Sequence, residues 1–410
     1  MEKYIRSISG TIPHTTKEVN ISLNGRNLIV TGANGSGKTS FLTEVFKKTS
    51  KLIISKRRAD LAQLEAQLIE QKRNLKNQTK GTRQYTHAEN QLTATNHELD
   101  SIIYGLQVDM PNNIQFSAEC DENEAVVGIY HASRAIQISV ANTAKGLQTE
   151  MENAKHIGKS DFGQSLEQHL VNLKNRRSLA LSEDNDVELA DKIEQWFIHF
   201  ESNLKVLMED KSTCLEFNSD TLKFSISQEG KALYTFQDLS SGYLAIFDIY
   251  ADLLMRTEYF KVTPERLKGT VFIDEIDAHL HVSLQRLILP FLTKSFPAVQ
   301  FIVTSHSPFV LMSVDDTVVY DIGRNSQIEE NLSFYSYSSV MEGILDTKTT
   351  SVLLEDAISK ISTIVTSESV NYELLKSLVD KIMPLSDKLN DREKAFYLLG
   401  VNKLLDQESD

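Results

Sequence analysis

The sequence predicts an α/β fold in which helices flank a mainly parallel sheet. Three observations favour this fold. A glycine-rich loop at 32–39 follows a short apolar run, and two later apolar runs, at 269–273 and 300–304, also end in polar residues. Apolar residues with helical 3-4 spacing fill 61–102 and most of the chain beyond 332. Strands that end in polar residues and alternate with helices are typical of parallel α/β sheets.

The composition is that of an ordered globular chain of 410 residues, with 41% hydrophobic and 24% charged side chains. No apolar run reaches the roughly 18 residues of a membrane span, and the first ten residues, MEKYIRSISG, lack the apolar core of a signal peptide. Cys120 and Cys214 are too few for a disulfide framework or a multi-cysteine zinc site. We therefore expect a cytoplasmic protein with no membrane partner.

Charge is distributed unevenly along the chain, whose formal net charge is −13. Residues 47–83 contain eleven cations and three acids, so a basic segment projects from an acidic body. The cations are Lys47, Lys48, Lys51, Lys56, Arg57, Arg58, Lys72, Arg73, Lys76, Lys80 and Arg83. This pattern argues against a surface coated uniformly for nucleic-acid binding and concentrates basic contacts in one segment.

The sharpest motif follows the predicted strand at 26–30. The segment GANGSGKT, residues 32–39, fits the pattern G-x-x-x-x-G-K-[ST] at every defined position. In such a loop, backbone N–H groups surround phosphate oxygens at the positive end of a helix. We expect Lys38 to reach the β- and γ-phosphates and Thr39 to ligate Mg²⁺. The predicted nucleotide-binding residues are Gly32, Ala33, Asn34, Gly35, Ser36, Gly37, Lys38, Thr39 and Ser40.

Two carboxylates end the apolar run of GTVFIDE, residues 269–275. Asp274 is expected to hold the Mg²⁺ hydration shell, and Glu275 to orient and deprotonate an attacking water. An acidic strand end is common in α/β proteins, but its combination with the phosphate loop favours a catalytic site.

Two further motifs refine the prediction. His306 follows the strand-like run at 300–304 and could reach a γ-phosphate oxygen, although a polar residue that merely closes a strand is the alternative. Ser240, Ser241 and Gly242 open an amphipathic helix at 243–255 and could form a second anion site. The alternative for this second motif is an ordinary serine N-cap.

Taken together, GANGSGKT, LSSG, VFIDE, DAHLH and TSHSP resemble the ABC-class ATPase head of the RecF, SMC and OLD-like proteins. More narrowly, they are similar to bacterial AAA-type ATPases of anti-phage systems such as Septu and PARIS. The resemblance implies an ABC-type head that hydrolyses ATP to ADP and phosphate with Mg²⁺, using Glu275, His306 and Lys38 as catalytic residues. It also implies that two heads share each site.

In such a homodimer of heads, Ser240 and Gly242 of one copy would face the ATP held by the other, and Asp277 would lie in the loop that couples the two sites. The resemblance further suggests Gln115 for the glutamine-bearing loop and Arg134 for an arginine at a strand end.

Residues 51–104 are predicted to form an insertion, a short antiparallel coiled-coil hairpin. Its two helical patterns, at 61–75 and 85–102, are separated by a polar stretch that contains Gly81. The arms should measure about 25 Å at 1.5 Å per residue. Its cations could contact nucleic-acid phosphates or an acidic protein such as a phage protein, or could simply solvate a helix face.

The whole chain is accordingly divided into four parts. These are the N-terminal half of the head (1–50), the hairpin (51–104), the C-terminal half of the head (105–331) and a helical region (332–410). The run at 317–322 is expected to close the sheet. The helical region would either dock a separate effector nuclease or simply pack on the head.

Two functions are compatible with this organisation. In the first, ATP-dependent head association senses phage or DNA signals and controls the effector nuclease. In the second, the protein is a RecF/SMC-like DNA-repair clamp that binds DNA directly.

Overall fold

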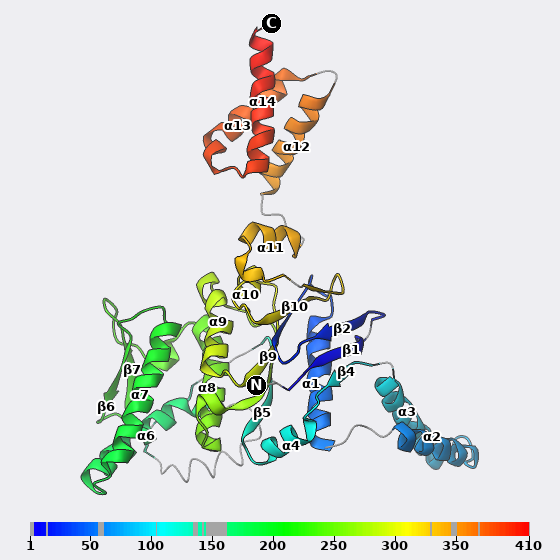
Figure 1. Ribbon diagram of the computed structural model, residues 1–410, viewed down its shortest axis with the longest axis vertical. Coiled ribbons are helices and arrows are strands. Elements are labelled where there is room, and N and C mark those ends of the chain that lie inside the picture. The colour runs from blue at the N-terminus through cyan, green and yellow to red at the C-terminus, as the bar shows by residue number, and fades with distance from the viewer. Residues whose placement is uncertain are drawn as a thin grey trace. The chain divides into compact units, whose positions relative to one another are not determined.

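A computed structural model describes most of the chain (Figure 1). The described residues are 4–13, 15–55, 61–103, 105–133, 138–141, 143–144, 162–328, 330–345, 351–367 and 370–409. The chain divides into two compact units, Met1–Tyr337 and Ser338–Asp410. The finer division into four parts stays a prediction.

The first unit is organised around a six-stranded sheet. Its strands are β3 (Asn27–Thr31), β5 (Ala125–Tyr130), β8 (Lys268–Ile273), β9 (Val299–Thr304), β10 (Thr317–Asp321) and β11 (Ser326–Ile328). Their order across the sheet is β11-β10-β3-β9-β8-β5. All neighbours are parallel except β10 and β11. Every residue of β3 and β9 is buried, as expected for parallel strands covered on both faces. The predicted α/β fold is therefore confirmed.

One detail of the sheet differs from expectation. The run at 317–322 does not close the sheet, because β10 lies between β3 and β11. The edge is formed by β11, a three-residue strand of sequence SQI that carries no apolar signal.

A second, antiparallel sheet joins β2 (Glu18–Ser22), β1 (Ser7–Thr11) and β4 (Gln107–Asp109). The Gln300 side chain connects the start of this layer to the main sheet, since its Nε2 donates to the carbonyls of Ile5 and Arg26 and its Oε1 accepts from Ile5 N–H. Side chains of α1 (Lys38–Ser55), including Phe41 and Leu42, share a core with both sheets. A separate hairpin pairs β6 (Cys214–Asn218) with β7 (Lys223–Ser227).

Helices cover the main sheet on both sides. In Figure 1, α1 lies on one side of its strands, and α8 (Ser241–Phe260) and α9 (Val282–Ser295) lie on the other. Within the described residues, the remaining helices of the first unit outside 51–104 are α4 (Asn113–Asp121), η1 (Phe162–Ser165), α6 (Leu166–Ser182), α7 (Val187–Leu207), η2 (Phe236–Asp238), η3 (Pro264–Arg266), α10 (Pro308–Leu311) and η4 (Leu332–Phe334). No helix within the described residues combines the length and apolar content that crossing a membrane requires.

The predicted insertion contains two helices, α2 (Leu61–Lys76) and α3 (Arg83–Ile103), which contact one another. Gly81, in the turn between them, has a φ of +87° that favours glycine. Thr82 lies in the same turn, and its hydroxyl donates to the Thr79 carbonyl. Coiled-coil packing between these helices stays a prediction. Of the predicted cations, Lys56, Arg57 and Arg58 lie outside the described residues.

The second unit is helical. It contains α12 (Val352–Thr366), α13 (Tyr372–Ile382), η5 (Met383–Lys388) and α14 (Asp391–Ser409), and α11 (Tyr337–Gly343) spans the boundary between the units. The unit has its own core of Ala357, Ile361, Leu375, Val379, Ile382 and Tyr397. Helix α14 crosses α12 closely at Gly400, where an added Cβ would lie 3.0 Å from Ile361 Cγ2.

Candidate active site

The phosphate loop connects β3 to α1, and glycine is required at its first position. Gly32 has a φ of +137°, and an added Cβ would lie 2.9 Å from Ile322 Cγ2. Gly35 and Gly37 also have positive φ values. These conformations turn the backbone of the loop inward, as an anion-binding loop requires.

Lys38, the first residue of α1, folds its side chain back over the loop. Its Nζ donates to the carbonyl oxygens of Gly32 at 3.0 Å and Ala33 at 3.1 Å. The residue is only 6% exposed. Burial lowers the pKa of the Lys38 ammonium, an effect that the nearby carboxylates of Glu275 and Asp274 partly offset. The loop thus holds a cation at its centre, beside the two predicted carboxylates.

Three oxygen-bearing side chains meet at Asp274. Its Oδ1 accepts hydrogen bonds from Thr39 Oγ1 at 3.2 Å and from Thr304 Oγ1 at 2.7 Å. Thr39 lies at the start of α1, whereas Asp274 and Thr304 lie at the ends of neighbouring strands. Hydroxyl and carboxylate oxygens are ligands that suit Mg²⁺, which takes few protein ligands and completes its shell with phosphates and water. The residues present therefore fit the predicted metal.

Glu275 follows Asp274 in an unusual backbone conformation. Its φ of +44° lies in the left-handed region, which a residue with a Cβ seldom adopts. The Glu275 N–H donates to Thr304 Oγ1 at 2.7 Å, and the next amide, of Ile276, donates to the Thr304 carbonyl at 3.0 Å. Thr304 thus fixes the turn that presents Glu275.

His306 belongs to the same electrostatic environment. Burial lowers the pKa of its imidazole and the Lys38 charge lowers it further, while Asp277 and Glu275 act in the opposite direction. The neighbouring Ser307 holds the turn, since its Oγ accepts from Phe309 N–H and donates to Gln285 Oε1 at 2.6 Å. The structure therefore brings Lys38, Thr39, Asp274, Glu275 and His306 into one site.

Ser240, Ser241 and Gly242 take a different position. Within the described residues, neither serine hydroxyl bonds the phosphate loop of its own chain, and Ser240 N-caps α8 without a side-chain hydrogen bond to it. Gly242 packs on the loop after the carboxylates, where an added Cβ would lie 3.1 Å from the His279 carbonyl oxygen. The first turn of α8 therefore touches the 277–281 segment.

One of the two candidates from the family resemblance, Gln115, lies away from this site. The Gln115 amide donates to Glu119, which pairs with Lys268 at 2.7 Å. Lys268 begins β8, whereas Asp274 follows the other end of that strand. Gln115 is therefore unsuited to contact a phosphate held by Lys38. Arg134 lies outside the described residues.

Sequence reasoning missed two residues that organise the site, Thr304 and Tyr130. Asp274 N–H donates to the Tyr130 carbonyl at 2.8 Å, so the end of β5 fixes its backbone. The only sequence signal was that both residues end strands beside the carboxylates, a position that many residues share.

Comparison with known proteins places this geometry in a family. Residues 73–313 match the AAA_21 family, described as "AAA domain, putative AbiEii toxin, Type IV TA system". This match covers more than half of the sequence, and the chain belongs to that family. The matched residues include Asp274, Glu275 and His306 and begin after the phosphate loop.

Individual relatives extend the comparison. The chain is 42% identical over 85 residues to the "Retron Ec83 probable ATPase" of Escherichia coli, a match that covers 20% of this chain and 16% of that protein. It is 30% identical over 177 residues to the "Septu protein PtuA" of Bacillus mycoides (strain KBAB4), covering 41% and 24% respectively. Each match thus spans a quarter or less of the relative's length. The predicted resemblance to bacterial AAA-type ATPases such as those of Septu is confirmed.

Among solved structures, a crystal structure of an Smc head bound to the C-winged helix domain of ScpA aligns with 79% of this chain and 96% of that one. The two share 13% sequence identity, and the TM-score is 0.37.

Proposed function

We propose that the protein is a Mg²⁺-dependent ATPase of the ABC class that acts as a nucleotide-controlled switch. The observation that carries the proposal is the convergence of Thr39, Asp274 and Glu275 beside Lys38. These groups come from two segments of the chain, and the hydroxyl of Thr304, on a third segment, binds both carboxylate-bearing residues.

The chain's own groups have distinct tasks in this reaction. The loop amides and the Lys38 ammonium bind the β- and γ-phosphates, and Thr39 and Asp274 hold the metal. When bound, Mg²⁺ would neutralise negative charge on the phosphates. Glu275 orients the attacking water and accepts its proton. Because its pKa is lowered, His306 is neutral near pH 7, and its remaining ring N–H can donate a hydrogen bond to a γ-phosphate oxygen.

We further propose that two copies associate through ATP. Ser240, Ser241 and Gly242 of one copy would bind the γ-phosphate held by the other, using the free N–H groups at the start of α8. This assignment is supported because, within the described residues, neither serine hydroxyl bonds the phosphate loop of its own chain.

The biological role proposed is anti-phage defence in the cytoplasm, in which the ATP state of the heads controls a separate effector nuclease. Support comes from the relatives named as a Septu protein and a retron ATPase. The compact helical unit Ser338–Asp410, which has its own core, is proposed to dock that nuclease.

Matched variants of the carboxylate and the lysine test the proposal. Glu275→Gln keeps the side-chain shape but removes the base, so hydrolysis should fall by about 100-fold or more. ATP should still bind, and the variant should form an ATP-dependent dimer by light scattering. Lys38→Ala should neither bind ATP nor dimerise. If Glu275→Gln hydrolyses ATP at the wild-type rate, the catalytic role of Glu275 is wrong.

The same two variants test whether a nuclease binds the ATP-bound protein. Tagged Glu275→Gln, purified from the native host in ATP, should retain a nuclease in stoichiometric amount that Lys38→Ala does not retain. Recovery of DNA and repair proteins without a nuclease would instead favour the DNA-repair clamp.

One observation favours that second candidate. Lys72, Arg73, Lys76, Lys80 and Arg83 are exposed around the tip of the hairpin, and the sequence between Gln71 and Ala88 contains no acid. Five exposed cations on an acidic protein suit a polyanion, and a nucleic-acid backbone is the partner we propose there.

A further inference from the structure

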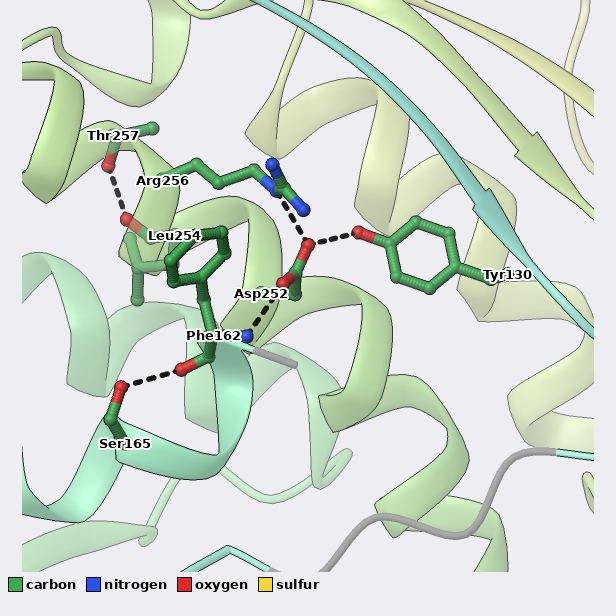
Figure 2. Close-up of polar contacts among 7 residues, drawn as sticks. All are labelled: Tyr130, Phe162, Ser165, Asp252, Leu254, Arg256 and Thr257. Atoms are coloured by element: carbon green, nitrogen blue, oxygen red, sulfur yellow. Dashed lines mark hydrogen bonds and ion pairs between the residues drawn. The ribbon is translucent and has the colours of Figure 1, made fainter. Parts of the chain in front are cut away.

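A buried carboxylate on α8, outside the site described above, gathers three segments of the first unit. Asp252 is 2% exposed. Its Oδ2 accepts from the Tyr130 hydroxyl at 2.5 Å and from Arg256 Nε at 2.8 Å, and its Oδ1 accepts from Phe162 N–H at 3.0 Å. Figure 2 shows the phenol and the guanidinium converging on the same oxygen. The Arg256 guanidinium also lies 4.8 Å from the centre of the Phe162 ring.

The Tyr130 phenol is a hydrogen-bond donor in this cluster. Burial, followed by the charge of Asp252, raises the pKa of the Tyr130 phenol well above its ordinary value. The phenol therefore keeps its proton and remains a donor to Asp252. Arg256 supplies the opposite charge that a buried carboxylate needs.

Tyr130 connects this cluster to the active site through a single residue. Its side chain binds Asp252 on α8, and its backbone carbonyl accepts from Asp274 N–H at 2.8 Å. Within the described residues β5 is an edge strand of the sheet, so its last residue has a strand neighbour there on one side only. Its side chain is held by the Asp252 carboxylate on α8.

Helix α8 therefore meets the carboxylate segment directly at one place and through Tyr130 at another. Its first turn touches the His279 carbonyl through Gly242, and about three turns further on Asp252 binds Tyr130. A rigid helix that shifts or rotates at its first turn must move both contacts together. The first turn is also the part of α8 that carries Ser240, Ser241 and Gly242.

We propose that Tyr130 and Asp252 are positioning residues for the ATPase site, through which α8 sets the position of Asp274. This inference rests on the proposed function of the site. When Ser240–Gly242 of one copy bind the ATP held by the other copy, α8 would shift. That shift would change the position of Asp274 in the copy to which α8 belongs.

The test uses the full chain with Tyr130→Phe, which preserves the ring and removes one hydroxyl. Tyr259→Phe is the matched control, because Tyr259 lies on α8 with Asp252 and its hydroxyl bonds Ser165 Oγ at 3.1 Å. Asp252→Asn is a second variant, but it leaves Arg256 without its carboxylate and could impair folding.

Two readouts separate positioning from general stability. In nucleotide-free protein, amide hydrogen exchange in the peptide that contains Asp274 should become about 10-fold faster in Tyr130→Phe and stay unchanged in Tyr259→Phe. The Mg²⁺ concentration for half-maximal ATP hydrolysis should rise about 10-fold in Tyr130→Phe alone, as when an outer partner of a metal ligand is removed.

The proposal is wrong if the exchange rate or the Mg²⁺ requirement of Tyr130→Phe equals that of the wild type. It is also wrong if Tyr259→Phe changes these quantities as much as Tyr130→Phe does. If the wild-type protein does not hydrolyse ATP, the proposed function fails. The exchange measurement then decides by itself whether α8 positions Asp274.

Discussion

A single hydroxyl organises the two carboxylate-bearing residues of the site. Thr304 donates to the Asp274 side chain and accepts from the Glu275 amide, so the residue that we propose holds the metal and the one that we propose activates water share one anchor. The phosphate loop and the carboxylates could be predicted from the sequence because each depends on a local pattern of residue types. Thr304 could not, because a threonine at a strand end is ordinary and its role arises only when β9 lies beside β8.

His306 gives a prediction at the same scale. Its folded-state pKa is lowered, chiefly by burial, so the unfolded chain binds a proton at a higher pH than the folded protein does. Stability contributed by neutral His306 should therefore be present above about pH 6.5 and be lost as the pH falls toward the folded-state pKa. His306→Asn should flatten the fall in the free energy of unfolding between about pH 7 and 5.

Urea titrations at several pH values measure this slope. His87→Asn, which removes an exposed imidazole on α3, is the matched control. A slope in His306→Asn as steep as in the wild type would show that another group causes the loss.

At the scale of elements, strands β3, β8 and β9 could be predicted because they are buried on both faces and read as continuous apolar runs. The edge of the sheet could not. β11 consists of three polar or half-buried residues and owes its existence to pairing with β10. The two hairpin helices could be predicted from the 3-4 spacing of most of their apolar residues.

The hairpin gives a prediction at this scale. If it binds a nucleic-acid backbone, replacing Lys76, Lys80 and Arg83 by Glu should lower affinity for a ~30-base-pair duplex by about 10-fold or more. The slope of log affinity against log salt should also become shallower, because fewer counterions are released. Fluorescence anisotropy at several salt concentrations measures both quantities.

The control variant makes the same change in net charge, but outside the hairpin. Lys211, Lys223 and Lys294 are exposed on the body, and their triple replacement by Glu should affect binding less. Equal losses in the two variants would mean that net charge, and not the hairpin, determines binding.

At the scale of the whole molecule, the two compact units have separate cores, which predicts separate unfolding transitions. Ile361 is fully buried in the second unit, so Ile361→Ala should lower the stability of that unit by about 3 kcal/mol. The transition of the first unit should stay in place. Scanning calorimetry of the full chain resolves the two.

Leu353→Ala is the control, because Leu353 lies on the same helix and is 76% exposed. It should move neither transition appreciably. A single transition that shifts as a whole in Ile361→Ala would show that the two units unfold together.

The order of strands across the sheet also governs when the site can come into being during synthesis. β3 carries the phosphate loop and leaves the ribosome early, yet both of its neighbours, β9 and β10, are made much later. Asn27 pairs with Thr317, about 290 residues further along the chain, which corresponds to roughly 15 to 60 s of translation. Until then the apolar strand has no partners and the loop has no sheet to hold it. An incomplete chain that ends before β9 therefore contains the phosphate-loop sequence without the means to use it.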